Sequence, residues 1–304
     1  MKTRIFSVYL LCSIVMGAFL SCSDISEAER LVVIDVVEHD TTAVDTTVID
    51  TANIDYFAPQ QRCVLIEDFT GQNCVNCPNA TDIINQLQNR MYGHKLVVAV
   101  AIHSGPLGVK PEKNPDGLAT DLGDTYYNYW KIEMQPYGVI DRSDGPLSID
   151  WWMAKVYYDL YEESEDGNDS DAAPRIAPVN IWAKTANSND NSNATDIEIK
   201  VAGVSGTTTG KLQVFITEDN ITAFQKMPDG KVNNEYIHNH VLRDAVNGTW
   251  GEDVTVAKDE MKSFSYHYTP QTAWKPEHLS VVAFVYNDDG VVQVVSLPLV
   301  NSDK

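Results

Sequence analysis

The pattern of apolar residues differs between the two halves of the chain, and the first half carries continuous apolar runs. Residues 63–66 and 96–102 are apolar throughout, which is typical of strands covered on both faces of a sheet. Between them, residues 79–91 carry apolar side chains at helical spacing and end near Gly93. This order of strand, helix and strand predicts a right-handed βαβ unit.

The second half shows a different pattern, in which apolar and polar residues alternate. Such alternation is typical of strands with one buried face. The alternating segments are 179–183, 197–201, 212–216, 264–268, 281–286 and 291–297. Between the last two, Asn287-Asp288-Asp289-Gly290 predicts a hairpin turn. About seven short strands without helices predict a β-sandwich.

A long insertion and a further helix complete the first half. Residues 104–130 contain several Pro and Gly residues and then an aromatic patch, Tyr126, Tyr127, Tyr129 and Trp130. Clustered aromatic residues are more often core than site, so we expect this patch to cover the sheet, with a substrate groove as the alternative. Residues 149–160 have a helical pattern.

The chain divides at a charged stretch, residues 162–173, whose composition is typical of a linker. We therefore expect an α/β domain at 59–165 and an all-β sandwich domain at 175–304. The 304 residues, 43% of them hydrophobic, suffice for one large core or two modest ones.

The N-terminus has the pattern of an exported protein. Lys2 and Arg4 precede an apolar run over residues 5–20, which is shorter than the roughly 20 residues of a membrane-spanning helix. These features predict a signal peptide at residues 1–21. Residues 19–22 resemble a bacterial lipobox, which implies cleavage before Cys22 and lipidation of that residue. An ordinary signal peptide with an incidental cysteine is the alternative.

Residues 22–58 form an acidic, Thr- and Asp-rich tether. Asp-Thr pairs recur at residues 40–42, 45–47 and 50–52, and these tripeptides resemble the acceptor pattern for protein O-glycosylation in Bacteroidetes. A β-prone linker explains the composition equally well. The polar stretch after Cys22 also resembles the export signal of surface lipoproteins in that group.

The net charge of the chain excludes some classes of binding partner. The formal charge is −21, and removal of Lys2 and Arg4 with the signal peptide makes it −23. Nucleic acid and anionic membrane surfaces would be repelled, so no nucleic-acid partner is expected. Because no later segment is apolar and long enough to span a membrane, attachment to the outer membrane would depend on Cys22, with an envelope or extracellular protein as partner.

The chemistry of the first half centres on Cys74-Val75-Asn76-Cys77, placed between the first strand and the helix. A thiol at a helix N-terminus is stabilised as thiolate by unpaired backbone N–H groups. The second cysteine, one turn inside the helix, could form or resolve a disulfide. Such a pair also supplies half of many zinc sites, but only Cys63 and His103 lie near, and Cys63 belongs to an apolar strand.

The surrounding residues resemble a thioredoxin. Asp68 and Phe69 end the first strand six and five residues before Cys74, where thioredoxins carry a buried acid and a core aromatic. Pro136 resembles the cis-proline that enters the next strand, since cis bonds are nearly confined to proline. The resemblance implies a thioredoxin-like domain with a Cys74–Cys77 disulfide, catalysis by those cysteines with Asp68 and Pro136, and neither cofactor nor metal.

Four strings also resemble a narrower group, the twenty-eight-kilodalton outer membrane protein family of the Bacteroidetes. They are Glu67-Asp68-Phe69-Thr70-Gly71, Cys74-Val75-Asn76-Cys77-Pro78, Gly138-Val139-Ile140-Asp141-Arg142 and His238-Asn239-His240-Val241-Leu242-Arg243. This resemblance covers most of residues 62–300. It implies an outer membrane lipoprotein, facing the periplasm or exposed at the surface, in a family regarded as receptors or adhesins.

Two functions follow from these observations. The first is a thiol–disulfide oxidoreductase acting through Cys74 and Cys77. The second is a non-catalytic surface receptor or adhesin that binds through the β-sandwich, because fold alone does not fix function. His238 and His240 would share one face of a strand and could seat a metal, but exposed or hydrogen-bonded strand histidines are the simpler interpretation. Glu67 is expected to be a solvent-facing partner of the acid or a strand-end charge.

Overall fold

The βαβ unit of the first half is present. Strand β1 (Val64–Thr70) runs parallel to β2 (Val97–His103), in a register that pairs Val64 with Val97 and Thr70 with His103. The connection contains helix α1 (Cys77–Gln86), which continues as one π-helical turn, η2 (Leu87–Met91).

The computed structural model describes residues 55–163, 172–188 and 193–300. Several predictions fall wholly or largely outside these residues: the signal peptide at 1–21, lipidation at Cys22, the tether at 22–58 with its Asp-Thr repeats, and the charged boundary at 162–173. None of the helices within the described stretches has the length and apolarity needed to cross a bilayer.

Two further strands and helices extend the unit. The chain continues through η3 (Gly105–Leu107), α2 (Asp121–Tyr129), β3 (Tyr137–Ile140), β4 (Pro146–Ser148), η4 (Ile149–Trp151) and α3 (Trp152–Leu160). Strand β3 is antiparallel to β1, and β4 is antiparallel to β3, which gives the order β2-β1-β3-β4.

Both faces of these strands are buried, which explains their continuous apolar sequence. Val64 and Ile66 belong to a core cluster with Trp152 of α3 and residues of α1. Leu65 belongs to a second cluster with Tyr126 of α2. Because side chains alternate along a strand, one apolar run supplies two cores.

The second half consists of strands. They are β5 (Val179–Asn187), β6 (Thr195–Gly203), β7 (Thr207–Glu218), β8 (Ile221–Lys226), β9 (Val232–His238), β10 (Val241–Ala245), β11 (Glu252–Ala257), β12 (Met261–Tyr268), β13 (Leu279–Asn287) and β14 (Gly290–Pro298), with a short turn of helix, η6 (Pro276–His278), before β13. The described chain is therefore mostly β-sheet with few helices, and the prediction of a β-rich second half is confirmed.

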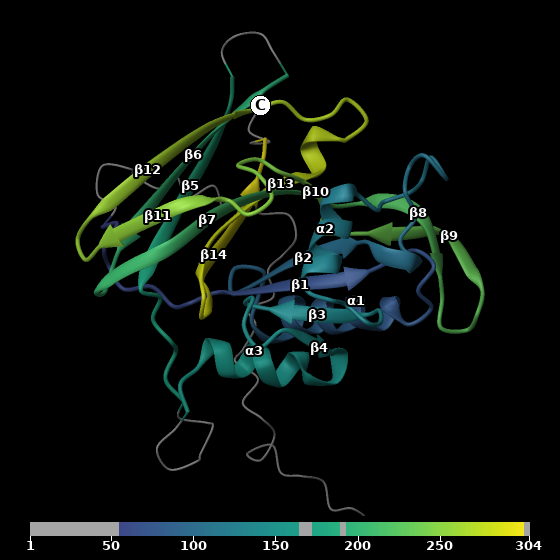
Figure 1. The fold of residues 1–304 in the computed structure, drawn as a ribbon, viewed down its shortest axis with the longest axis horizontal. Coiled ribbons are helices and arrows are strands. Elements are labelled where there is room, and N and C mark those ends of the chain that lie inside the picture. The colour runs from purple at the N-terminus through teal and green to yellow at the C-terminus, as the bar shows by residue number, and fades with distance from the viewer. Residues whose placement is uncertain (1–54, 164–171, 189–192, 301–304) are drawn as a thin grey trace, which may run out of the picture. The chain divides into compact units, whose positions relative to one another are not determined.

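One long sheet runs through both halves. Its order is β14-β13-β7-β10-β2-β1-β3-β4. Strand β11 pairs with residues 207–212 of β7, on the edge opposite β13. Strand β10 joins β2 in parallel, where Val241 pairs with Ala101 and the Ala101 N–H donates to the His240 carbonyl at 2.7 Å. The boundary at 162–173 stays a prediction about sequence modules, but the two segments share this sheet (Figure 1).

The remaining strands form two small sheets. Strands β12, β6 and β5 make a three-stranded sheet that shares a core with β7, β11, β13 and β14, and Figure 1 shows it on the opposite side of the molecule from α1 and α2. Strands β8 and β9 pair only with each other, as a hairpin.

The insertion contains a helix that the sequence did not indicate. Helix α2 begins after Thr120, whose hydroxyl accepts a hydrogen bond from the Gly123 N–H at 2.9 Å, an N-terminal cap. Tyr126 is fully buried and Tyr129 is 58% exposed. The aromatic patch therefore covers the sheet through Tyr126, as expected, and leaves other rings at the surface.

Candidate functional site

The two cysteines lie at the end of β1 from which α1 departs. Cys74 and Cys77 form a disulfide with a Cα–Cα distance of 5.4 Å. The Cys74 N–H donates to the Gly71 carbonyl at 2.9 Å in the turn between strand and helix. The helix begins at Cys77, so the expected placement of Cys77 one turn inside the helix is wrong: Cys74 lies in the turn, and Cys77 is the first helical residue.

Asp68 lies on β1 behind the disulfide. Its side chain is buried, at 2% exposure, and burial raises its pKa from 3.8 to about 8. Among the described residues, its Oδ1 atom has no hydrogen-bond partner. Asp68 and Cys77 line the same cavity, whose volume of about 30 Å³ is room for a water molecule.

Two histidines line this cavity as well, and the sequence indicated neither as part of a redox site. His103 ends β2 and His238 ends β9, both at most 5% exposed, with ring centroids 5.1 Å apart. Burial lowers the pKa of both, to about 4 for His238 and well below 6.5 for His103, where the neighbouring His238 and Arg243 contribute. Both rings are therefore neutral at pH 7.

Each of these histidines leaves one ring nitrogen without a partner. Within the described chain, neither His103 Nδ1 nor His238 Nε2 forms a hydrogen bond. Together with Asp68 Oδ1, three buried polar atoms from three strands surround a water-sized cavity next to Cys77. Such a cavity can hold a bridging water molecule, because water satisfies buried polar groups of this kind.

The β8–β9 hairpin covers the disulfide. Gln225 Nε2 donates to the carbonyl of Cys74 at 2.8 Å and of Gly71 at 3.3 Å, and the Lys226 N–H donates to the Gln72 carbonyl at 2.9 Å. Both cysteines are only 2% exposed. Figure 1 shows the hairpin at the end of the sheet toward which β1 points.

Pro136 lies at the entry to β3, and its peptide bond with Gln135 is cis. Gln135 Nε2 donates to the carbonyls of Thr70 at 2.6 Å and Ser104 at 3.1 Å, which holds this segment against the ends of β1 and β2. Pro136 does not line the cavity that Asp68 and Cys77 share. The structure thus brings Asp68 and the cysteines together, and their roles and that of Pro136 stay predictions.

The expectation that His238 and His240 share a strand face is wrong. His240 lies in the turn between β9 and β10 with a φ of 59°, and its Nδ1 atom is 3.1 Å from Asp219 Oδ1. His238 instead packs against His103. The described residues contain no group of three or more side chains placed to hold a metal ion.

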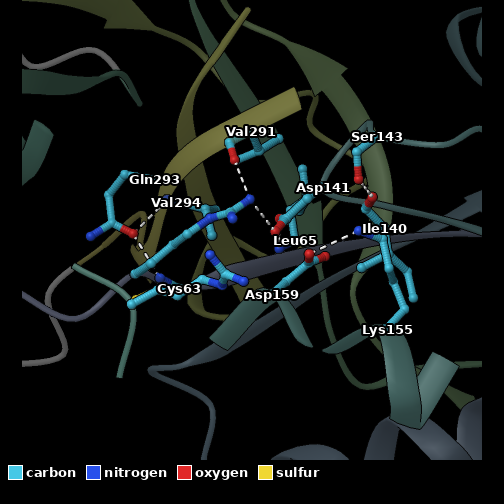
Figure 2. Close-up of polar contacts among 12 residues, drawn as sticks. Cys63, Leu65, Ile140, Asp141, Ser143, Lys155, Asp159, Val291, Gln293 and Val294 are labelled. Carbon is cyan, nitrogen blue, oxygen red and sulfur yellow. Dashed lines mark hydrogen bonds and ion pairs between the residues drawn. The ribbon is translucent and has the colours of Figure 1, made fainter. Parts of the chain in front are cut away.

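A second polar cluster joins the two halves behind the site. Asp141 lies between Leu65 and Val291 in Figure 2: its Oδ1 atom accepts from the Leu65 N–H at 2.7 Å, and its carbonyl accepts from the Val291 N–H at 2.6 Å. Arg62 Nη2 donates to Asp141 Oδ2 at 2.7 Å and to the Val291 carbonyl at 2.6 Å. Burial raises the pKa of Asp141 to about 7, although Arg62 opposes this rise.

Glu67 and Arg142 form a second buried pair. Arg142 donates through Nε at 2.9 Å and through Nη2 at 2.7 Å to the two Glu67 oxygens, and the two side chains are 3% and 0% exposed. Glu67 is therefore not the solvent-facing group we expected. The Asp141-Arg142 dipeptide thus holds β1 through the Arg142–Glu67 ion pair and joins β1 to β14 through the hydrogen bonds of Asp141, a structural role. Burial and Asp141 raise the pKa of the unpaired Cys63 to about 11, which disfavours its thiolate.

Comparisons with known proteins found a matching family model and similar solved structures. The family model described as outer membrane protein Omp28 matches residues 123–303. The structure of HBP35 of Porphyromonas gingivalis is similar, with 16% identity over 79% of this chain and 76% of that chain and a TM-score of 0.57, which indicates a shared fold. A domain of the outer membrane lipoprotein Omp28 from the same organism is 28% identical over 42% of this chain and 93% of that chain, with a TM-score of 0.30. The search of curated proteins found no match.

Proposed function

The chain belongs to the Omp28 outer membrane protein family, and on that premise we propose that it is a lipid-anchored protein whose Cys74–Cys77 pair exchanges disulfides with envelope proteins. Family membership confirms the resemblance found in the sequence and assigns the protein to the outer membrane. Attachment through a lipid on Cys22 is part of the proposal. The observation that carries the redox activity is the burial of Asp68, with its raised pKa, in the cavity that Cys77 lines.

The topology around the cysteines supports a thioredoxin-like domain. Its strand order is β2-β1-β3-β4, with β2 parallel and β3 antiparallel to β1. Helices α1 and α3 pack on one face and α2 on the other. The cysteine pair lies between β1 and α1, and the cis-proline precedes β3, as in the thioredoxins that the sequence resembles.

The oxidised pair would accept two electrons from a substrate dithiol. A substrate thiolate attacks Cys74 Sγ, the Cys74–Cys77 bond breaks, and the electron pair goes to Cys77 Sγ. Asp68, protonated near neutral pH because of its raised pKa, supplies the proton to Cys77 through the cavity water. The second substrate thiolate then attacks the substrate sulfur that is bound to Cys74 in the mixed disulfide, and Cys74 leaves as thiolate.

The neutral histidines complete this proton path. Because His103 and His238 are uncharged at pH 7, each can accept a hydrogen bond from water at its free ring nitrogen without adding a positive charge beside Asp68. They would orient the cavity water between Asp68 and Cys77. Their role is positioning, since both line the cavity with Cys77, whereas Cys74 does not line it.

The hairpin must move before a substrate reaches Cys74. Strands β8 and β9 pair with no other strand. Hydrogen bonds, chiefly those of Gln225 and Lys226, and the packing of Ala223 and His238 hold the hairpin over the cysteines. Each such bond contributes about 0.5–1.5 kcal/mol net. Opening is therefore compatible with turnover.

Trapping of a mixed disulfide tests the proposal. In a Cys63→Ser background, the reduced full chain carrying Cys77→Ser is incubated with glutathione disulfide and weighed by intact mass spectrometry. The proposal predicts a glutathione adduct that maps to Cys74 and is absent from the matched Cys74→Ser chain. No adduct, or equal adducts on both variants, would contradict it.

A binding function through the β-rich half is the second candidate. The observation in its favour is the hairpin itself, because it leaves both cysteines 2% exposed. The disulfide would then be a structural bridge in a receptor or adhesin. This candidate predicts that the Cys77→Ser chain forms no adduct unless it is unfolded.

A further inference from the structure

A second hollow lies on the molecule, and no residue lines both it and the redox cavity. Its volume of about 790 Å³ lies in the range of small-molecule sites. It is lined by Tyr129 and Trp130 at the end of α2, Arg142 after β3, Lys211 of β7, Trp250 before β11 and Asp288 after β13, among others.

One wall of this pocket is aromatic and held in place by ring contacts. The Trp250 ring lies 4.5 Å from that of Tyr129 and 5.2 Å from that of the buried Tyr126, and Tyr129 lies 5.1 Å from Trp130. The Tyr286 hydroxyl donates to the Trp250 carbonyl at 2.8 Å. Tyr129 is nevertheless 58% exposed. The wall is therefore a preformed apolar surface that is open to a ligand.

One buried donor at the pocket has no acceptor. Among the described residues, Trp130 Nε1 forms no hydrogen bond. The Arg142 guanidinium, by contrast, faces the hydroxyls of Tyr126 and Tyr286, which can accept from it while they donate to the Thr249 and Trp250 carbonyls. A buried donor left without a partner costs about 1–3 kcal/mol. A ligand that brings oxygen acceptors would recover this energy.

The charges at the pocket disfavour an anion. Arg142 is neutralised by Glu67, and Lys211 Nζ lies 2.7 Å from Asp253 Oδ1. Asp288 is exposed and, within the described chain, forms no ion pair. The carboxylates and the Asn287 amide therefore offer acceptors to hydroxyl groups, while no cation remains free for a phosphate or a carboxylate.

We propose that this pocket binds a neutral saccharide. A sugar ring has an apolar C–H face that fits against Tyr129 and Trp250, and one of its oxygens accepts from Trp130 Nε1. Its hydroxyls donate to Asp288 and Asn287. A flat heteroaromatic ligand would cover the rings but leave the carboxylate without hydroxyl donors, and an acidic sugar would meet Asp288.

Binding of defined sugars to the full chain tests this proposal. The probes are maltotriose, mannotriose, galactotriose and chitotriose, titrated by calorimetry in a detergent without a sugar headgroup. The indole N–H resonance of Trp130, assigned with Trp130→Phe, reports hydrogen bonding at the site. We expect saturable binding of at least one probe that shifts this resonance. We expect about tenfold weaker binding in Tyr129→Ala, the loss typical of an aromatic contact, and weaker binding in Asp288→Asn.

Controls make each result decisive. Tyr158 of α3 is 49% exposed and lies outside the pocket, so Tyr158→Ala should bind like the unaltered chain. The proposal is overturned if none of the four sugars binds at millimolar concentration, or if Tyr129→Ala binds as tightly as Tyr158→Ala. Tighter binding of adenosine, or of the acidic sugar trigalacturonate, would overturn it too.

Discussion

Asp68→Asn should stabilise the protein increasingly as the pH rises. The carboxyl is buried without a partner for Oδ1 among the described residues, so folding disfavours its ionised form and its pKa rises from 3.8 to about 8. Between these values the folded state binds more protons than the unfolded state. Stability contributed by neutral Asp68 is thus complete below about pH 4 and is lost as the pH rises toward 8.

The magnitude follows from the pKa values. Each pH unit within this window costs about 1.4 kcal/mol, so keeping Asp68 protonated in the folded state costs about 4 kcal/mol at pH 7. The uncharged amide that Asp68→Asn introduces avoids this cost, but its own N–H groups lack partners, which offsets about 1–3 kcal/mol. The difference in free energy of unfolding between variant and wild type should therefore grow by about 3 kcal/mol from pH 5 to pH 7.

Urea unfolding of the oxidised full chain at pH 5, 6, 7 and 8, followed by circular dichroism, measures this difference. Asp82 is an exposed aspartate on α1, and Asp82→Asn is the matched control, expected within about 0.5 kcal/mol of wild type. If the free energies of unfolding of Asp68→Asn and wild type differ by a constant amount from pH 5 to pH 8, Asp68 does not titrate as a buried acid. The proposed proton transfer to Cys77 would then lack its donor.

Three further predictions concern the neighbours of the site. Gln225→Ala removes the hydrogen bonds that hold the hairpin over the disulfide, so reduction by dithiothreitol should be several-fold faster than in the exposed control Gln271→Ala; equal rates would argue against a lid. Glu67→Gln leaves Arg142 buried and uncompensated, which should cost about 3–5 kcal/mol in urea unfolding, and a loss under 1 kcal/mol would contradict the buried pair. Burial lowers the pKa of His238 to about 4, so protonation of this ring should cost about 3 kcal/mol as the pH falls from 6.5 to 4; the stability of His238→Phe relative to wild type should rise by this amount over that range, and a constant difference would count against it.

Local patterns in the sequence predicted the centre of the fold. The apolar runs at 63–66 and 96–102 indicated strands covered on both faces, and β1 and β2 lie between two cores. The alternating segments of the second half all lie within strands. In each case the signal is the spacing of apolar side chains within a few consecutive residues, and it can be recognised without knowing which distant segment pairs with them.

The parts that depend on distant pairing could not be read from local pattern. Strand β9 is largely exposed, and β8 has only two buried residues, Ala223 and Gln225, so neither the hairpin nor the placement of His238 was indicated. The placement of His103 near Asp68 could have been predicted. Asp68 pairs with Ala101 on β2, and His103 is two residues further along that strand, so both side chains lie on the same side of the sheet. Glu67 looked like a surface charge because its partner, Arg142, lies 75 residues away.

The reduction potential of the Cys74–Cys77 couple tests the central claim most directly. The oxidised full chain would be equilibrated with glutathione buffers, and the free thiols counted by alkylation and mass spectrometry in a Cys63→Ser background. A working exchange centre predicts a potential between about −120 and −270 mV, the range of thiol–disulfide oxidoreductases. A potential below about −300 mV, where structural disulfides lie, would contradict the account and leave the pair as a bridge beneath the hairpin.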